Sequence, residues 1–337
     1  NAGSYADSVA SKNEAENITM VLYPNASTEN GQELRLRQQY FLASASLQDM
    51  IRKWRARHGD DFATFADKHC FQLNDTHPAI AVAELMRLLM DEHGLEWDEA
   101  WHITSSTMAY TNHTLLPEAL EMWPVSLFRR LLPRLLDIIY EINARHMAEV
   151  RERYPGDWPR QERLSIIDDR SGSFVRMANL ATVGSYSVNG VSALHTQILK
   201  ARVLRDFHEF YPGKFNNKTN GVTQRRWLAA CNKGLAGLIT DKIGDAWTTE
   251  LSELDKLKAF ADDKMFQQQW RSIKFQNKIR LARDLEKKTG LHVNPGTMFD
   301  VQVKRIHEYK RQLLNLLHAI HLYSVIRSGN GHTITPR

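Results

Sequence analysis

A short strand, a polar loop and the start of a helix follow one another in His69-Cys-Phe-Gln-Leu-Asn-Asp-Thr-His-Pro78. Residues 69–74 have the composition of a strand, and Pro78 stands where the first turn of a helix accepts proline. The same order returns at 298–307, where a β-branched run leads into a helix after Asn-Pro-Gly, as at the start of a βαβ unit. These two stretches predict an α/β fold.

Helical periodicity dominates the rest of the chain. Helices are expected over 31–57, 78–93, 134–153, 190–209 and most of 227–289, and strands over 104–110, 164–167 and 174–177. Residues 211–226 are dense in turn formers, which predicts a domain junction within this segment. We therefore expect two domains, at residues 1–212 and 213–337.

The composition is that of a soluble globular protein, with 42% hydrophobic and 25% charged residues among 337. A chain of this length favours two domains. The longest apolar runs are broken by charge and fall well short of the roughly 20 residues that a membrane span needs, so no membrane association is expected. The net charge of +5 favours an anionic ligand but is too small to indicate nucleic acid.

The two cysteines, Cys70 and Cys231, stand far apart and form neither a zinc-binding nor a disulfide spacing. Free cysteine is usually buried, so we expect two buried thiols in a reducing, cytoplasmic environment. His77 and His113 lack a third ligand at local spacing, so no metal site is predicted.

Two polar segments follow predicted strands. In Gln72–Pro78, Asp75 is placed to orient a hydroxyl or an imidazole, although capping of the next helix by Asp75 or Thr76 explains the pattern equally well. In Tyr110–Thr114, five consecutive polar-tipped side chains form a hydrogen-bonding loop of the kind that holds sugar hydroxyls. A capping loop explains this second segment nearly as well.

Two further segments lie in the second half of the chain. Asn217–Thr223 is followed by Arg225-Arg226-Trp227, a pattern more often found on a solvated face than in a binding site. Lys304–Arg311 places cations at the start of a predicted helix, where they oppose the helix dipole unless an anion offsets them. We therefore expect a phosphate at this helix start, with a solvated basic face as the alternative.

Seven stretches, in order along the chain, resemble the α-glucan phosphorylases, the family of glycogen, starch and maltodextrin phosphorylases. They are Val21–Pro24, Glu33–Gln38, Gln72–Pro78, Ala109–Leu120, Val188–Val191, Asn217–Val222 and Phe299–Leu314. Seven motifs in the order of the family argue against chance similarity.

The resemblance implies a helix-rich α/β fold of the GT-B type, in which two Rossmann-like domains face each other across a cleft. Residues 1–212 correspond to the later part of the N-terminal glucan-binding and catalytic domain, and residues 213–337 to the beginning of the C-terminal domain that binds cofactor and phosphate. The chain is expected to be an internal fragment, incomplete at both ends. It lacks the family's N-terminal region and the glycine-rich segment whose lysine anchors pyridoxal 5'-phosphate, so the fragment alone is expected to be inactive.

The resemblance also implies roles for individual residues. His113 and Asn220 resemble the residues that hydrogen-bond the glucosyl unit, with His113 among the catalytic residues. Lys304 and Arg305 resemble the binders of the substrate phosphate, and Lys310 resembles the partner of the cofactor phosphate. The resemblance places these three residues, like His113, among the catalytic residues. The further substrate-binding positions are Asp75, His77, Thr114, Val191, Tyr309 and Asn25, the last in a gate loop where Ala26 replaces an acidic residue common in the family.

The implied reaction is phosphorolysis of a terminal α-1,4-glucosidic bond of an α-glucan by inorganic phosphate, which releases glucose 1-phosphate with retention of configuration. In the family the cofactor's 5'-phosphate serves as a proton relay, and no carboxylate pair of the kind used in glycoside hydrolysis is evident in this sequence. The family is typically dimeric, allosteric and cytoplasmic. Two alternatives stay open: a GT-B glycosyltransferase that uses a nucleotide sugar, and a non-catalytic glucan-binding remnant.

Overall fold

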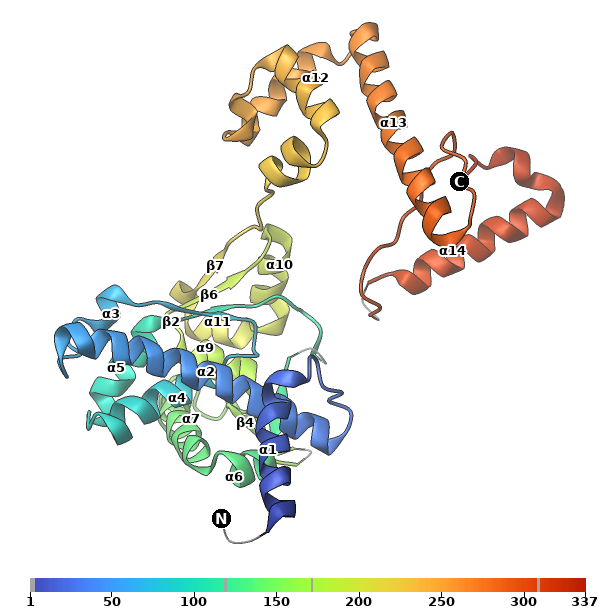
Figure 1. Cartoon of the computed structure of the whole chain (residues 1–337). Helices are drawn as coiled ribbons and strands as arrows, with labels where there is room; N and C mark the ends of the chain where they lie inside the picture. Colours follow the sequence, from blue (N-terminus) through green and yellow to red (C-terminus); the bar gives the residue numbers. More distant parts are fainter. Residues whose placement is uncertain (1–3, 118–119, 171, 308–309) are drawn as a thin grey trace. The chain divides into compact units, whose positions relative to one another are not determined.

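The chain folds as two compact units, Asn1–Asn220 and Gly221–Arg337 (Figure 1). The computed structural model describes residues 4–117, 120–170, 172–307 and 310–337. The division between the units falls inside the turn-rich segment 211–226, but after the boundary predicted at residue 212. The reason is that strand β7 (Phe215–Asn217) pairs with a strand of the first unit.

A four-stranded parallel sheet, in the order β1-β2-β6-β7, forms the centre of the first unit. Its other strands are β1 (Phe71–Asn74), β2 (Met108–Thr111) and β6 (Ser187–Gly190). Leu73 pairs with Tyr110, which pairs with Val188, and all three side chains are buried. The strand predicted from residues 69–74 is therefore confirmed, and the fold is helix-rich α/β with a parallel sheet.

Helices surround this sheet, and α4 lies at the centre of their packing, in contact with α2, α5, α7 and α9. They are α1 (Tyr5–Met20), α2 (Glu29–His58), α3 (Phe65–Lys68), α4 (Ala81–Arg87), α5 (Trp97–Thr107), α6 (Val125–Leu131), α7 (Pro133–Arg153), α8 (Trp158–Leu164), α9 (Met177–Gly184), α10 (Ala193–Ile198) and α11 (Arg205–Phe210). Every residue from 81 to 86 is buried, as expected for a helix packed on several sides. The helices predicted over 31–57 and 134–153 are confirmed as α2 and α7.

Three local predictions for this unit are wrong in part. Thr104–Thr107 was expected in a strand but forms the last turn of α5, because both threonines are buried and Thr107 Oγ1 donates to the carbonyl of Ile103 (2.9 Å). The helix expected over 190–209 is divided into α10, a π-helical turn (Leu199–Val203) and α11. Leu164 ends α8, and the neighbouring strands form a small antiparallel sheet of β3 (Met122–Pro124), β5 (Phe174–Arg176) and β4 (Ile167–Asp168).

The second unit is helical. It contains α12 (Lys233–Ile243), α13 (Lys264–Thr289), α14 (Gln312–Val325), a π-helical turn (Arg225–Ala230) and a 3-10 segment (Leu251–Phe260). Its core is a small cluster of Leu235, Leu238, Ile239, Trp247 and Phe266. No strand occurs among the residues described in this unit, so the strand predicted over 298–303 is wrong. That run is a loop whose Met298 N–H donates to the carbonyl of Pro336 (2.8 Å), without a partner strand to complete a ladder.

Both cysteines are exposed, so the prediction of buried thiols is wrong. Cys70 immediately precedes the edge strand β1, and its Sγ lies 3.3 Å from the hydroxyl of Tyr186. Cys231 follows the π-helical turn of the second unit. Within the described part of the chain, no helix is both long enough and apolar enough to cross a membrane.

Candidate functional site

The carboxyl ends of the four parallel strands meet at one edge of the sheet, where open α/β sheets bind their ligands. β1 ends at Asn74, β2 at Thr111, β6 at Gly190 and β7 at Asn217. The loops that follow them carry six of the predicted site residues, namely Asp75, His77, His113, Thr114, Val191 and Asn220. We call these loops, together with the side chains that contact them, the carboxyl edge.

The turn after β1 is held against the end of β2. Asp75 has a left-handed backbone, with φ of 72°, and its N–H donates to the carbonyl of Thr111 (3.0 Å). Its carboxylate accepts from the N–H of Thr76 (2.8 Å), which fixes the turn from within. Across the same two strands, Nε2 of His113 lies 2.6 Å from Oδ1 of Asn74. Asp75 and His113 are therefore presented at neighbouring strand ends.

His195, on α10, links the loops after β2 and β6. Its Nδ1 accepts from the backbone N–H of Val191 (3.3 Å), and its Nε2 lies 2.9 Å from Oδ1 of Asn112. Because Nδ1 accepts, the proton of the neutral ring is on Nε2, which donates to Asn112. Burial, assisted by the charge of His113, lowers the pKa of His195 and so favours this neutral form. Asn112 donates in turn to the hydroxyl of buried Tyr110 (3.0 Å).

Backbone hydrogen bonds bring the loop after β7 to the same edge. The N–H of Asn220 donates to the carbonyl of Val191 (3.1 Å), and the N–H of Lys218 donates to the carbonyl of Gly190 (3.0 Å). Asn220 is exposed, so its amide is accessible to a ligand at this edge. Thr114 is half-buried, and its Oγ1 accepts from the N–H of Leu116 (3.3 Å).

Glu121 joins α2 to the turn after β1. Its Oε1 accepts from Arg35 Nη2 (2.7 Å) and Gln39 Nε2 (2.9 Å), while Oε2 accepts from the Thr76 hydroxyl (3.1 Å) and pairs with His77 Nδ1 (3.1 Å). Burial opposes ionisation of Glu121, but the hydrogen bond and charge of His77, together with the charge of Arg35, outweigh it and lower its pKa to about 2. The same hydrogen bond raises the pKa of His77 against partial burial. This carboxylate therefore stays ionised near neutral pH.

Asn25 lies in a turn before α2. Its Oδ1 accepts from the N–H (3.0 Å) and the hydroxyl (2.8 Å) of Ser27, and its carbonyl accepts from the hydroxyl of Thr28 (3.3 Å). Thr28 is the N-cap of α2 and accepts from the N–H of Gly31 (3.2 Å). The side chain of Asn25 thus stabilises a helix start by the Asx-turn geometry common before helices.

The cationic segment of the second unit differs from its prediction. α14 begins at Gln312, after Arg311 with φ of 52°, so Lys304, Arg305 and Lys310 precede the helix instead of lying in its first turn. Two glutamines fold this loop back: Gln312 Nε2 donates to the carbonyl of Arg305 (2.7 Å), and Gln302 Nε2 donates to that of Lys310 (3.1 Å). Lys304 and Arg305 are exposed and Lys310 is half-buried, while Tyr309 lies outside the described residues.

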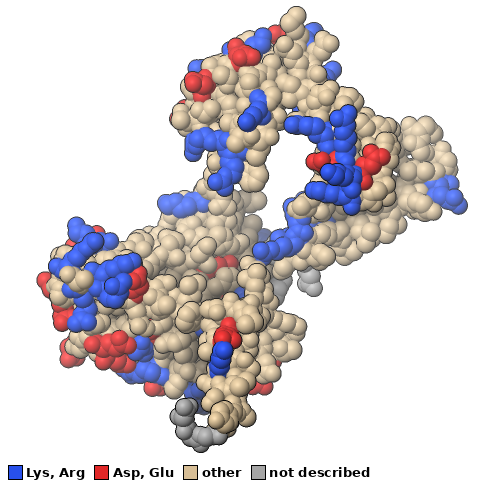
Figure 2. Space-filling view, in the orientation of Figure 1, with Lys and Arg blue, Asp and Glu red and all other residues tan. Residues whose placement is uncertain are grey.

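Positive charge in the second unit is not confined to this loop. Lys and Arg side chains also gather over α13 in the view of Figure 2. Lys274, Arg280 and Lys287 are among the exposed residues of this helix. Charge alone therefore does not single out the loop, and its anchoring by two glutamines is the feature that distinguishes it.

Four residues of the carboxyl edge were not selected from the sequence, namely Asn112, His195, Arg35 and Glu121. Asn112 stands inside the polar segment Tyr110–Thr114, and its neighbour His113 was chosen instead. Arg35 and Glu121 are 86 residues apart, and no local pattern reports their contact. Among the residues that the structure describes, no group of three or more histidine, cysteine or acidic side chains could hold a metal ion.

Comparison with known proteins assigns the family. The model of the carbohydrate phosphorylase family matches residues 1–337, the whole chain. The glycogen phosphorylase of Synechocystis sp. is 55% identical over 340 residues, which cover 100% of this chain and 40% of the relative. The brain form of Mus musculus is 50% identical and the liver form of Bos taurus 49% identical, with 41% and 40% of those relatives covered.

The chain belongs to the carbohydrate phosphorylase family, which is a family of glycosyltransferases. The family predicted from the sequence motifs is thus confirmed. The chain spans about two fifths of the length of the curated relatives that it matches.

Proposed function

We propose that this chain supplies residues for the phosphorolysis of terminal α-1,4-glucosidic bonds of an α-glucan, which releases glucose 1-phosphate with retention of configuration. The observation that carries the proposal is the carboxyl edge. His113, Asn220 and the polar groups beside them present several hydrogen-bonding groups at one sheet edge, the arrangement that orients a polar ligand. In this proposal His113 and Asn220 hold the glucosyl unit, with Asp75, His77, Thr114 and Val191 beside them.

The ionised state of Glu121 excludes this residue as the general acid of a glycoside hydrolase. A glycosidase needs one carboxylic acid that is protonated near its working pH. Glu121 cannot supply that acid, because His77 and Arg35 keep it ionised with a pKa of about 2. In the phosphorolysis proposed here a phosphate group moves the proton, so the reaction does not need Glu121 as an acid.

Phosphate handling is assigned to the second unit. Lys304 and Arg305 would bind the substrate phosphate, Lys310 would contact the phosphate of pyridoxal 5'-phosphate, and Tyr309 is proposed from its sequence position as a further substrate-binding residue. This donor set fits that group chemically, because cations on an anchored loop complement a phosphate dianion. When bound, the cofactor would supply a phosphate that relays a proton. A GT-B arrangement, a homodimer, allosteric control and a cytoplasmic location belong to the same proposal, as does the inactivity of this piece by itself.

A chimera tests the proposed reaction. Residues 1–337 would replace the matching part of the Synechocystis glycogen phosphorylase, and the product would be loaded with pyridoxal 5'-phosphate. We expect glucose 1-phosphate from maltodextrin and inorganic phosphate, and no turnover by residues 1–337 alone. Release of free glucose, or turnover only with a nucleotide sugar, would show a different reaction. A folded chimera that binds maltodextrin without turnover would favour the non-catalytic remnant.

Two substitutions in the chimera separate the two roles. His113→Ala should lower kcat at least about tenfold, because a sugar hydrogen bond is lost. Arg305→Ala should raise KM for phosphate about tenfold and leave maltodextrin affinity nearly unchanged. Exposed His102 and Arg271 provide matched alanine controls. Equal losses of phosphate and glucan affinity in Arg305→Ala would contradict its assigned role.

A further inference from the structure

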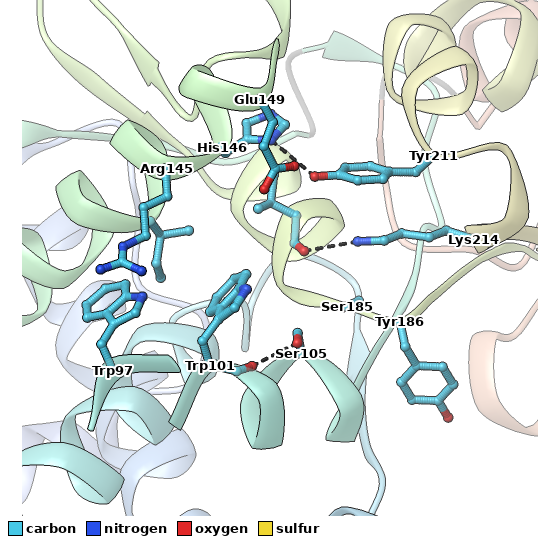
Figure 3. A pocket seen from close by; sticks show the side chains of 12 residues that line it. Trp97, Trp101, Ser105, Arg145, His146, Glu149, Ser185, Tyr186, Tyr211 and Lys214 are labelled. Atoms are coloured by element: carbon cyan, nitrogen blue, oxygen red, sulfur yellow. Dashed lines mark hydrogen bonds between the residues drawn. The ribbon is translucent and has the colours of Figure 1, made fainter. Parts of the chain in front are cut away.

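A cavity of about 460 Å³ lies at the other edge of the main sheet (Figure 3). Its lining includes Ser105, Ser185 and Lys214, which stand shortly before the first residues of β2, β6 and β7. The amino ends of these parallel strands therefore face the cavity, and the carboxyl edge described above is at their opposite ends. The remaining walls come from α5, α7, the end of α9 and Tyr211, which follows α11.

One wall of the cavity is flat and aromatic. Trp97 and Trp101, four residues apart on α5, present their rings to it (Figure 3). The guanidinium of Arg145 lies 4.8 Å from the centre of the Trp97 ring and is paired with Asp98 (2.8 Å) and Glu141 (2.7 Å). Because its charge is already compensated, Arg145 extends the wall without adding an uncompensated cation.

A second wall carries the half-buried side chain of Lys214. Lys214 Nζ donates to the carbonyls of Thr182 (3.2 Å) and Val183 (3.0 Å) and lies 4.0 Å from the centre of the Tyr211 ring. Within the described parts of the chain, no carboxylate comes within ion-pair distance of Lys214. Glu149, which also lines the cavity, is exposed. A partly buried cation without a paired anion is costly.

His146, beside Lys214, adds no second positive charge because it is neutral. Its Nε2 donates to the carbonyl of Leu164 (3.2 Å), and its Nδ1 accepts from the hydroxyl of Tyr211 (3.2 Å). Burial lowers the pKa of His146 to about 4, so the ring stays uncharged near neutral pH. Burial lowers the pKa of Lys214 to about 8, against the charge of Glu149, so the ammonium form still predominates near neutral pH.

Two hydrogen-bonding groups of the lining are buried without a partner. Ser185 is completely buried and its Oγ has no hydrogen-bond partner among the residues described here. The same holds for Nε1 of Trp97. Buried polar groups are nearly always satisfied in folded proteins, and an exception in a cavity points to something that fills it. Ser185 can donate or accept, whereas the indole N–H can only donate.

We propose that this cavity binds a small organic anion that combines a carboxylate with a flat apolar body, the class represented by benzoate. The carboxylate would accept from Ser185 and offset the charge of Lys214. The apolar body would lie against Trp101 and Val183. This site is separate from the carboxyl edge and does not depend on the function proposed for it.

Titration of the full chain tests the proposal without an activity assay. Benzoate should bind at least about tenfold more tightly than benzyl alcohol, which has the same ring but no charge. The indole N–H signal of Trp101, assigned from Trp101→Phe, should shift on benzoate addition. Equal affinities for the two probes would overturn the anion assignment, and the absence of saturable binding would show that the cavity holds water only.

Substitutions of lining residues test whether benzoate binds in this cavity. Ser185→Ala removes a hydroxyl that has no described partner, so folding should be unaffected while benzoate affinity falls about fivefold or more. Lys214→Met should abolish the preference for benzoate over benzyl alcohol, and Lys68→Met, at an exposed lysine of α3, should change nothing. If Lys214→Met does not fold, Ser185→Ala and the comparison of benzoate with benzyl alcohol still decide whether the cavity binds the anion. Unchanged benzoate affinity in Ser185→Ala would overturn the site.

Discussion

Glu121 is the residue that connects most parts of the carboxyl edge. It contacts Arg35 and Gln39 on α2 and Thr76 and His77 in the turn after β1. Because these partners belong to two elements far apart in the sequence, one half-buried carboxylate fixes the position of the turn that carries Asp75. The stability of this network should depend on pH in a window set by two groups.

Glu121→Gln tests the network. The pKa of Glu121 falls from 4.5 to about 2 in the folded chain, so its stabilisation is complete above 4.5 and is lost as pH falls toward 2. The pKa of His77 is raised above 6.5, so its contribution is present below 6.5 and is lost as pH rises through the folded value. Between these two pH limits, the free energy of unfolding of the wild type should exceed that of the variant by about 1–3 kcal/mol.

Thermal melts from about pH 2 to pH 9 would measure this difference. The difference in stability between wild type and Glu121→Gln should be largest near pH 5 to 6. It should become smaller at lower and at higher pH. Glu152, which is exposed, provides a Glu→Gln control that should show no such profile. A difference in stability that does not vary with pH would mean that the ion pairs of Glu121 do not stabilise the carboxyl edge.

At the level of elements, α10 lies directly on the end of β6. A Cβ built at Gly190 would come 3.0 Å from Cα of Thr196, a backbone atom of α10 that cannot move by itself. The same helix carries His195, which holds Val191 and Asn112. The absence of a side chain at Gly190 is therefore what allows His195 to reach two loops.

Gly190→Ala should move α10 away from the strand. Overpacking of this kind costs about 1–3 kcal/mol, and the hydrogen bond from Val191 to His195 should be weakened with it. Urea unfolding gives the loss of stability, and the ring nitrogen shifts of His195 report the hydrogen bond. Gly213→Ala is the matched control, since nothing lies within 4 Å of a Cβ there. Equal stability of the two variants would contradict the close approach.

Local patterns predicted the elements whose packing follows their period. α2 and α7 were found because their buried residues recur at helical spacing. Thr104 and Thr107 were misassigned because burial in the core overrode the β-preference of threonine. The loops after β1 and β2 were located because polar residues follow strands there, whereas Glu121 was missed because its partners on α2 lie more than 80 residues away.

The whole molecule combines two units with very different cores. In the first unit the buried cluster runs from α2 to β7 and includes most of the helices. In the second it is limited to residues of α12, α13 and the turn around Trp247. α14 leaves most of its apolar side chains exposed, among them Leu313, Leu316 and Ile320. Less apolar burial means less stabilisation for each ordered residue.

The rates of amide hydrogen exchange should differ between the two units. Amides of α12, α13 and α14 are expected to exchange about 100-fold faster or more than those of α4 and β2, since opening the smaller core costs less free energy. Calorimetry should show two transitions, with the second unit unfolding first. Similar protection in both units, or one transition for the whole chain, would mean that the second unit is stabilised beyond what its own core provides.

The exposure of the two cysteines has a practical consequence for spectroscopy. The chain contains two cysteines, both exposed, one in each unit. A donor and an acceptor dye can therefore be attached through native thiols without any engineered residue. Energy transfer between dyes on Cys70 and Cys231 would then measure the distance between the two units in solution. A change in energy transfer on adding maltodextrin or phosphate would show that the units move relative to each other.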